Sequence, residues 1–222
     1  MKYYPLNLDI RNRKCLVVGG GAVGTRKVLT LLACGAMVTV ISPELTDILR
    51  DLFQKGKLEW ISRPYSASDL MDAFLVIGAT HDTSLNNQIH LDAEKHQKLC
   101  NIADQPESCN FILPSIVNRG DLVITISTSG KSPAYAKKLR QTLESSFGEE
   151  NIIFLRLMGT VRKRILGKGL GMEDHNLIFN KLINSGLLEL IRKNDESAIN
   201  ETLLEILGNG YDFKTLIQTE DD

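Results

Sequence analysis

The chain has 222 residues, of which 43% are hydrophobic, and its 26 basic and 27 acidic side chains give a formal net charge of −1. This length allows one large domain or two small ones with a real core. No stretch of about 18 apolar residues occurs, and residues 1–6 lack the apolar core of a signal peptide, so we expect no membrane span and no membrane partner.

The first predicted strand and the turn after it are the most informative part of the chain. Residues 15–18 (Cys-Leu-Val-Val) have the composition of a strand, and Gly19, Gly21 and Gly24 then follow the spacing G-x-G-x-x-G. In this motif the first glycine makes a tight turn, the second lets the backbone approach a pyrophosphate, and the third lets the helix pack close to the strand.

The residues after the glycines complete a β-α-β unit. A helix is predicted over 26–34, it stops at Gly35, and a second strand follows at 37–41. A pyrophosphate would bind the free N–H groups at the helix N-terminus, next to Ala22 and Val23. The complete unit favours a dinucleotide site over a plain strand-to-helix turn.

The end of the second strand departs from the usual NAD pattern. An acidic residue normally stands there and binds the ribose hydroxyls. Here Ser42 and Pro43 follow the strand, and Glu44 is the nearest carboxylate. We predict that Pro43 and Glu44 contact the cofactor, through the Glu44 side chain or through backbone groups. No arginine stands at this strand tip to bind a 2′-phosphate, so NAD is favoured over NADP.

Strands are also predicted at 58–61, 73–78 and 99–103, and a helix over about 84–97. Strands that alternate with helices predict an α/β fold, a Rossmann-like doubly wound parallel sheet over residues 1–113. Ligands of such sheets bind at the carboxyl ends of the strands. Four residues fall at those ends and form the expected site: Gly19, Ser42, Thr80 and Asp104.

Two segments of different character follow the predicted sheet domain. Residues 114–148 contain a β-rich run at 122–127, a polar turn that ends in an N-capping serine and a proline, and a helix over 134–147. Residues 149–222 carry apolar residues at helical spacings. We therefore expect a small α+β segment and then a helical C-terminal domain.

Charge is distributed unevenly over these segments. Residues 114–169 hold ten basic and four acidic side chains, and residues 170–222 hold four basic and eleven acidic ones. One interpretation is that the two stretches form solvated faces that attract each other. The other is that the basic stretch forms a surface for an anionic ligand. No nucleic-acid motif accompanies the charge, so we expect no nucleic-acid partner.

The cysteines and histidines show no metal-binding spacing. Cys15, Cys34, Cys100 and Cys109 form no C-x-x-C pair, and the four histidines form no H-x-x-x-H pair. No fixed metal site is predicted from them. Scattered cysteines favour reduced thiols, so we expect a cytoplasmic protein.

Several motifs together resemble one family. They are Tyr4-Pro5-Leu6, the glycine motif, Ala79-Thr80, the block at 100–104 with 111–116, and the turn at 127–133. Over residues 1 to about 145, the chain resembles the precorrin-2 dehydrogenase and sirohydrochlorin ferrochelatase family, the N-terminal module of siroheme synthase.

This resemblance implies NAD-dependent oxidation of precorrin-2 to sirohydrochlorin, and in many members the insertion of ferrous iron to give siroheme. It implies a homodimer, with residues 114–148 as the dimerisation segment. Asp104 matches the aspartate proposed as catalytic in the family, which would accept a proton during oxidation and pyrrole N–H protons during iron insertion.

Precorrin-2 is a polycarboxylate, so a cationic wall is expected to bind it. The residues of the basic stretch that we predict to contact the substrate are Ser129, Lys131, Lys137 and Arg140, and Arg162 and Arg164 are further candidates. Three functions stay open at this point: a bifunctional dehydrogenase and ferrochelatase, a dehydrogenase without chelatase activity, and a non-catalytic NAD-sensing regulatory module.

Overall fold

The structure of the chain is a computed structural model that describes residues 2–167 and 172–218. Contacts divide the chain into two compact units, and the boundary in sequence lies between Leu113 and Pro114. Within the described residues, no helix is long and apolar enough to cross a bilayer. A further division of the second unit at residue 148 stays a prediction.

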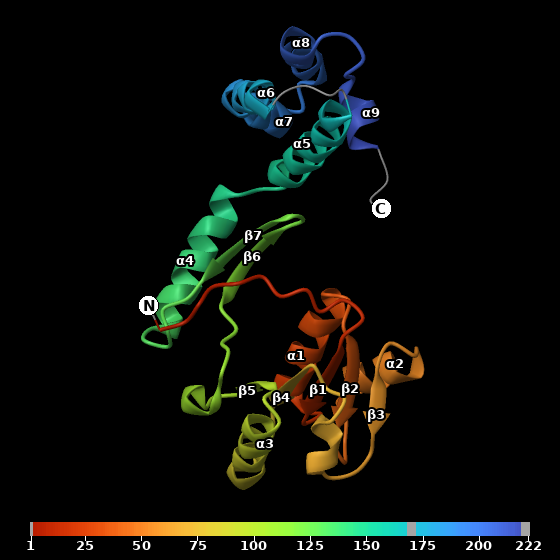
Figure 1. Ribbon diagram of the computed structural model, residues 1–222, viewed down its shortest axis with the longest axis vertical. Helices are drawn as coiled ribbons and strands as arrows, with labels where there is room; N and C mark the ends of the chain where they lie inside the picture. Colours follow the sequence, from red (N-terminus) through yellow and green to blue (C-terminus); the bar gives the residue numbers. More distant parts are fainter. Residues whose placement is uncertain (1, 168–171, 219–222) are drawn as a thin grey trace. The chain divides into compact units, whose positions relative to one another are not determined.

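A parallel sheet of five strands forms the centre of the first unit (Figure 1). Its strand order is β3-β2-β1-β4-β5, so the connection reverses direction between the neighbours β1 and β4. This order confirms the predicted Rossmann-like α/β fold, in which ligands bind at the point of reversal. The strands are β1 (Lys14–Val18), β2 (Met37–Ile41), β3 (Glu59–Ile61), β4 (Leu75–Gly78) and β5 (Leu99–Ile102).

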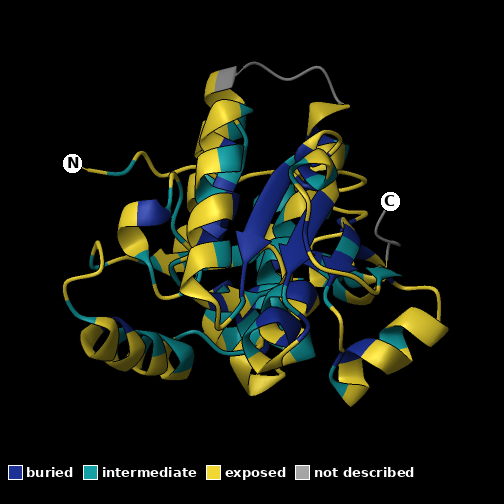
Figure 2. Cartoon of the chain, turned by 90° about the horizontal axis from the view of Figure 1, so that it is seen from below, coloured by how far each residue is buried: buried dark blue, intermediate teal, exposed yellow. Residues whose placement is uncertain are grey.

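Helices cover both faces of this sheet. On one face, α1 (Ala22–Ala33) and α2 (Asp47–Gln54) pack on the strands, and on the other face α3 (Thr83–Lys95) and the 3-10 turn η1 (Ala67–Leu70) do so. Strands that are buried from both sides need apolar residues at every position, which explains the continuous apolar runs of β1 and β4. Figure 2 shows these strands as buried.

The second unit begins with an antiparallel hairpin and continues as helices. The hairpin pairs β6 (Ser115–Arg119) with β7 (Leu122–Ile126), and Gly120 in its tight turn has a φ of 65°. Six helices follow: α4 (Pro133–Ser146), α5 (Glu150–Leu166), α6 (Met172–Asn184), α7 (Leu187–Lys193), α8 (Glu196–Leu207) and α9 (Phe213–Ile217).

The core of the second unit lies among helices α5 to α9. In the described part of segment 114–148, the buried hydrophobic residues are Val117 of β6 and Ala136 of α4. The hairpin and α4 therefore contribute little to a core of their own. The main cluster is made of Leu157, Val161, Ile165, Leu182, Leu187, Ile191, Ile199, Leu203, Tyr211 and Leu216.

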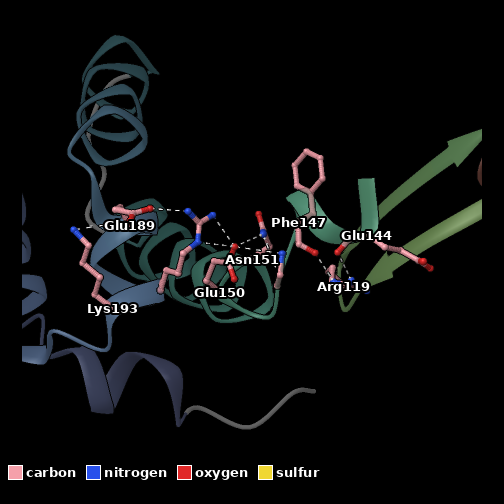
Figure 3. A network of polar contacts seen from close by, with 9 residues as sticks. Arg119, Glu144, Phe147, Glu150, Asn151, Glu189 and Lys193 are labelled. Carbon is pink, nitrogen blue, oxygen red and sulfur yellow. Dashed lines mark hydrogen bonds and ion pairs between the residues drawn. The ribbon is translucent and has the colours of Figure 1, made fainter. Parts of the chain in front are cut away.

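Polar contacts join the elements around the start of α5 (Figure 3). The Arg119 guanidinium at the end of β6 donates to the carbonyls of Phe147, at 2.6 Å, and Glu144, at 2.9 Å. Carbonyls at the C-terminus of a helix, here α4, lack hydrogen-bond partners within the helix, and Arg119 supplies them. The Glu150 carboxylate accepts two hydrogen bonds from Arg192 of α7 and one from the Gly148 amide. These contacts fix the hairpin to α4 and α5 to α7.

Candidate cofactor-binding and catalytic site

The turn after β1 brings three backbone segments close together. Gly19 has a φ of 114°, and a Cβ atom there would collide with the carbonyl group of Ala79 after β4. A Cβ atom at Gly24 would collide with the carbonyl oxygen of Gly19, so α1 packs directly on the turn. The first and third glycines of the motif are therefore required by close packing between β1, β4 and α1.

Gly21 differs from these two glycines because a Cβ atom there would meet no other atom within 4 Å. It is the N-cap of α1, and no side chain caps this helix and no acidic residue lies in its first turn. The first N–H groups of α1, next to Ala22 and Val23, thus keep their partial positive charge available for an anion.

A cavity of about 360 Å³ lies over the carboxyl ends of the strands. It is bounded by the glycine turn after β1 and by residues that follow each of the other four strands. Gly24 lies beneath it in the packed turn, and Glu44 is exposed and does not line it. The predicted site residues that line the cavity are Gly19, Gly21, Ala22, Val23, Ser42, Pro43, Thr80 and Asp104.

The turn after β4 is held by paired side chains. The hydroxyl of Thr80 lies 2.9 Å from Oδ1 of the buried Asn86, whose amide nitrogen donates to the Thr80 carbonyl at 3.0 Å. Asp82 caps α3 by accepting a hydrogen bond from the Leu85 amide at 3.1 Å. Thr80 therefore stands on a well-fixed turn that faces the cavity.

Asp104 follows β5, is exposed and lines the cavity. Its backbone is in the left-handed region, with a φ of 62°, which costs about 1 kcal/mol or more for a residue other than glycine. Such strain persists only where the surrounding structure holds it, and it is common at functional sites.

Cys109 holds the turn that carries Asp104. Its sulfur accepts a hydrogen bond from the Ile102 amide at 3.2 Å, and the thiol lies 3.2 Å from the Gln105 carbonyl, to which it donates. Burial raises the pKa of this thiol, so it stays protonated and able to donate. Cys109 thus acts on the position of Asp104.

Lys27 of α1 lies within electrostatic reach of the same turn. Burial lowers the pKa of its ammonium group and the neighbouring Arg26 adds to the effect, while Asp104 and Cys109 act in the opposite direction. Sequence reasoning missed Lys27, because only the tertiary structure brings it near the turn after β5.

The cavity also contains residues from the tip of β3 that sequence reasoning missed: Arg63, Pro64 and Tyr65. The Tyr65 hydroxyl donates to Asp92 of α3 at 3.1 Å, and burial followed by this contact raises the pKa of the phenol. An arginine is therefore present at this end of the cavity, although none stands at the β2 tip itself. Arg63 comes just after the third predicted strand, and this position could have indicated that it lies at the carboxyl ends of the strands.

The predicted substrate residues lie in the second unit, on the turn before α4 and on α4 itself. Ser132 caps this helix by accepting a hydrogen bond from the Tyr135 amide, with Pro133 at its first position, as predicted. The four substrate candidates differ in setting. Ser129, Lys131 and Lys137 are exposed, and Arg140 forms an ion pair with Glu144.

Comparisons with known proteins agree with this geometry. Residues 6–115 match the family described as putative NAD(P)-binding, and residues 119–146 match the one described as sirohaem biosynthesis protein central. The chain is 36% identical over 211 residues to a siroheme synthase of Nitrosococcus oceani, and 35% identical over 207 residues to one of Zymomonas mobilis. The chain belongs to the family of the siroheme synthase N-terminal module.

Those alignments cover 95% and 93% of this chain but only 45% and 44% of the two relatives, so the chain spans less than half of their length. A solved structure described as SirC, precorrin-2 dehydrogenase, matches with a TM-score of 0.79 and 26% identity, and the match covers 92% of this chain and 98% of that one. The family resemblance read from the motifs is confirmed.

Membership of the siroheme synthase family also bears on the cofactor. The putative NAD(P)-binding match spans the glycine turn, the strand tips and Asp104, and it confirms the predicted dinucleotide cofactor. The residues fit such a ligand, because the open space at Gly21 lies beside an uncapped helix N-terminus in a cavity at the strand ends. Among the described residues, no group of three or more His, Cys, Asp or Glu is arranged to hold a metal ion.

Proposed function

We propose that this chain is an NAD-dependent dehydrogenase that oxidises precorrin-2 to sirohydrochlorin. The observation that carries the proposal is the place of Asp104, an exposed residue that lines the same cavity as the glycine turn. A proton acceptor beside a dinucleotide site is the minimum that removal of a hydride and a proton requires.

From the strand order we propose which part of the cavity holds which part of NAD. The glycine turn and the N-terminus of α1 would hold the pyrophosphate, and the residues after β2 and β3 would hold the adenosine. The residues after β4 and β5 would then hold the other half, on the side of Asp104. When bound, NAD supplies the hydride acceptor.

Asp104 is the group that we propose as proton acceptor. The hydrogen bonds of Cys109 and the contact of Ala103 with β4 hold its turn, where the Ala103 amide donates to the Gly78 carbonyl at 2.8 Å. A fixed base loses little entropy when it meets its substrate. Lys27 of α1 lies within electrostatic reach of this carboxylate.

Features of the second unit support two further parts of the proposal, the binding of the substrate and the formation of a homodimer. The exposed Lys131 and Lys137, with Ser129 and Arg140, offer a polar and cationic segment for a polycarboxylate. The hairpin exposes Ile116 and Val123, at 40% and 47%. A two-stranded hairpin is marginal alone, which supports a homodimer in which these residues are covered.

We further propose a cytoplasmic enzyme in which the same carboxylate serves ferrous iron insertion into sirohydrochlorin, by accepting pyrrole N–H protons. Iron is a substrate in this step, and the macrocycle supplies four nitrogen ligands. Insertion of iron into sirohydrochlorin in the absence of NAD would distinguish the bifunctional enzyme from a dehydrogenase without chelatase activity.

Anaerobic incubation with precorrin-2 and NAD tests the dehydrogenase directly. Wild-type protein should produce the absorption spectrum of sirohydrochlorin together with NADH. Asp104→Asn should lower kcat by about 10²- to 10⁴-fold, the usual contribution of a general base, and leave NAD affinity unchanged.

The matched control is Asp51→Asn, which removes an exposed carboxylate on α2 that pairs with Lys55. This variant should keep wild-type kinetics, because such surface pairs contribute little. NAD binding without any turnover in the wild type would favour the sensing module, and unchanged kcat in Asp104→Asn would remove this residue from the mechanism.

A further inference from the structure

Arg63 is the cation at the adenosine end of the cavity. It follows β3, and among the described residues that line the cavity no other lysine or arginine occurs. The β2 tip has no acidic residue, since Ser42 and Pro43 stand where a ribose-binding carboxylate would be expected. The charge that a ribose or a 2′-phosphate would meet at this end is therefore set by Arg63 and its partner.

That partner is Asp69 of η1, and the two side chains form a bidentate pair. Nη2 of Arg63 donates to Oδ1 of Asp69 at 2.6 Å, and Nη1 donates to Oδ2 at 2.9 Å. The Asp69 side chain is only 8% exposed, and the Arg63 side chain is 43% exposed. The carboxylate is thus buried, whereas the guanidinium that pairs with it is partly exposed and belongs to a residue that lines the cavity.

Two further contacts hold this pair in place. Asp69 accepts a hydrogen bond from the Ser66 amide at 2.8 Å, in a capping box at the start of η1. Nη1 of Arg63 also donates to the Pro64 carbonyl at 2.9 Å. The Arg63 guanidinium holds the pKa of the Asp69 carboxyl below its usual range, so the carboxylate is ionised and the pair is neutral at physiological pH.

Several other polar groups at this end already have hydrogen-bond partners. The Trp60 indole donates to the Ser42 carbonyl at 2.9 Å, and the Ser62 hydroxyl donates to the Pro43 carbonyl at 3.3 Å. The Tyr65 hydroxyl is bound to Asp92. The Ser42 and Pro43 carbonyls of the β2 tip thus each accept a hydrogen bond from β3 or from the residue after it.

We propose that Arg63 and Asp69 together determine the choice of dinucleotide, with the buried Asp69 charge preventing Arg63 from binding the 2′-phosphate of NADP. A 2′-phosphate adds close to two negative charges, and it would meet a guanidinium already neutralised and a buried carboxylate behind it. NAD brings a neutral hydroxyl to the same place. This inference rests on the proposed function, because it requires the dinucleotide to bind in this cavity.

Calorimetric titration of the full chain with NAD and with NADP tests the inference. The wild type should bind NAD more tightly than NADP. Asp69→Asn keeps an acceptor for the Ser66 amide but frees the Arg63 charge, so NADP affinity should rise by about tenfold or more relative to NAD, the gain expected from one charge-assisted hydrogen bond. In the double variant with Arg63→Gln this gain should disappear.

Arg63→Gln alone changes an exposed side chain and leaves the buried carboxylate unpaired, so it should shift the ratio the other way, further towards NAD. Asp9→Asn is the matched control, because Asp9 forms a bidentate pair with Arg11 in the same unit but outside the cavity. It should leave the ratio of the two affinities unchanged.

Specific outcomes overturn the inference. The first is a wild type that binds NADP more tightly than NAD. The second is a pair of single variants that bind NAD but keep the wild-type ratio of NADP to NAD affinity. The third is a double variant that retains the gain in NADP affinity of Asp69→Asn. If the wild type binds neither dinucleotide, the proposed function fails together with the inference. If it binds NAD with an unaltered ratio in the variants, only the inference fails.

Discussion

The two glycines that differ most in their surroundings, Gly19 and Gly21, should respond differently to alanine. Gly19→Ala should destabilise the first unit, because the methyl group would collide with backbone that cannot move away. Gly21→Ala should leave stability nearly unchanged and weaken NAD binding, because its methyl group would occupy open space in the cavity that the cofactor needs.

The magnitudes follow from the two environments. At Gly19 a left-handed backbone costs alanine about 1–2 kcal/mol, and the collision with the Ala79 carbonyl adds about 1–3 kcal/mol, so a loss of about 2–5 kcal/mol is expected. At Gly21 the φ of −81° suits alanine. At this position alanine is a poorer N-cap than glycine, which lowers the free energy of unfolding by under about 1 kcal/mol. Alanine also reduces the entropy of the unfolded chain, which raises the free energy of unfolding by a similar amount.

Urea unfolding followed by tryptophan fluorescence measures the first unit selectively, because Trp60 of β3 is the single tryptophan of the chain. Calorimetric titration with NAD gives the affinity of each variant. Gly159→Ala in α5 is the control, since nothing lies within 4 Å of its Cβ position. It should leave NAD affinity unchanged and stabilise α5 by about 0.5–1 kcal/mol, which circular dichroism detects.

The reasoning is refuted if Gly19→Ala unfolds at the wild-type urea concentration, or if Gly21→Ala binds NAD as tightly as the wild type. A large loss of stability in Gly21→Ala would also contradict it, because the packing around that position would then differ from the structure described.

Acid should destabilise both units through carboxylates paired with arginine. Arg63 and Arg192 hold the pKa values of Asp69 and Glu150 below their usual range. The two ion pairs therefore contribute their full stabilisation above the unfolded-state pKa of the carboxyl groups, about 4. This stabilisation is lost as the pH falls through the lower pKa values of the folded state. The urea midpoint of the first unit should decline with falling pH in the wild type, and it should decline less in Asp69→Asn. Equal declines in the two proteins would contradict the role of the Asp69 carboxylate in this pH dependence. Alkylation at about pH 8 should label the exposed Cys34 first, because burial raises the pKa of Cys15 to about 11 and that of Cys100 to about 12. Peptide mass spectrometry measures this order, and labelling of Cys100 as fast as Cys34 in folded protein would be inconsistent with the buried sheet.

Local patterns predicted the sheet of the first unit well, because its strands are buried on both faces and its glycines are forced by packing. The boundaries moved by a few residues: α1 begins at Ala22 rather than at residue 26, and β4 begins at Leu75 rather than at residue 73. Helix α2 was not predicted, since it is short and has one fully buried residue, Leu49. Strand β6 was also missed, because Asn118 and Arg119 break its apolar pattern.

The site was predictable where it depends on one turn and unpredictable where it depends on neighbouring strands. Gly19, Gly21, Thr80 and Asp104 follow strands that the sequence pattern predicts directly, and they line one cavity. Arg63 enters the same cavity only because β3 pairs with β2, a register set by tertiary contacts. For Glu44 the sequence left open a contact through the side chain or through backbone groups, and the structure shows the residue exposed and outside the cavity lining.

The left-handed backbone at Asp104 has a consequence for protein engineering. Glycine adopts this conformation without strain, so a redesign guided by stability alone would choose it and would delete the carboxylate. With Asp104 as the proton acceptor that we propose, selection for stability and selection for turnover would oppose each other at this position. An acidic residue kept in such a conformation at the tip of a parallel strand is a criterion for locating reaction centres in Rossmann-like domains with unidentified substrates.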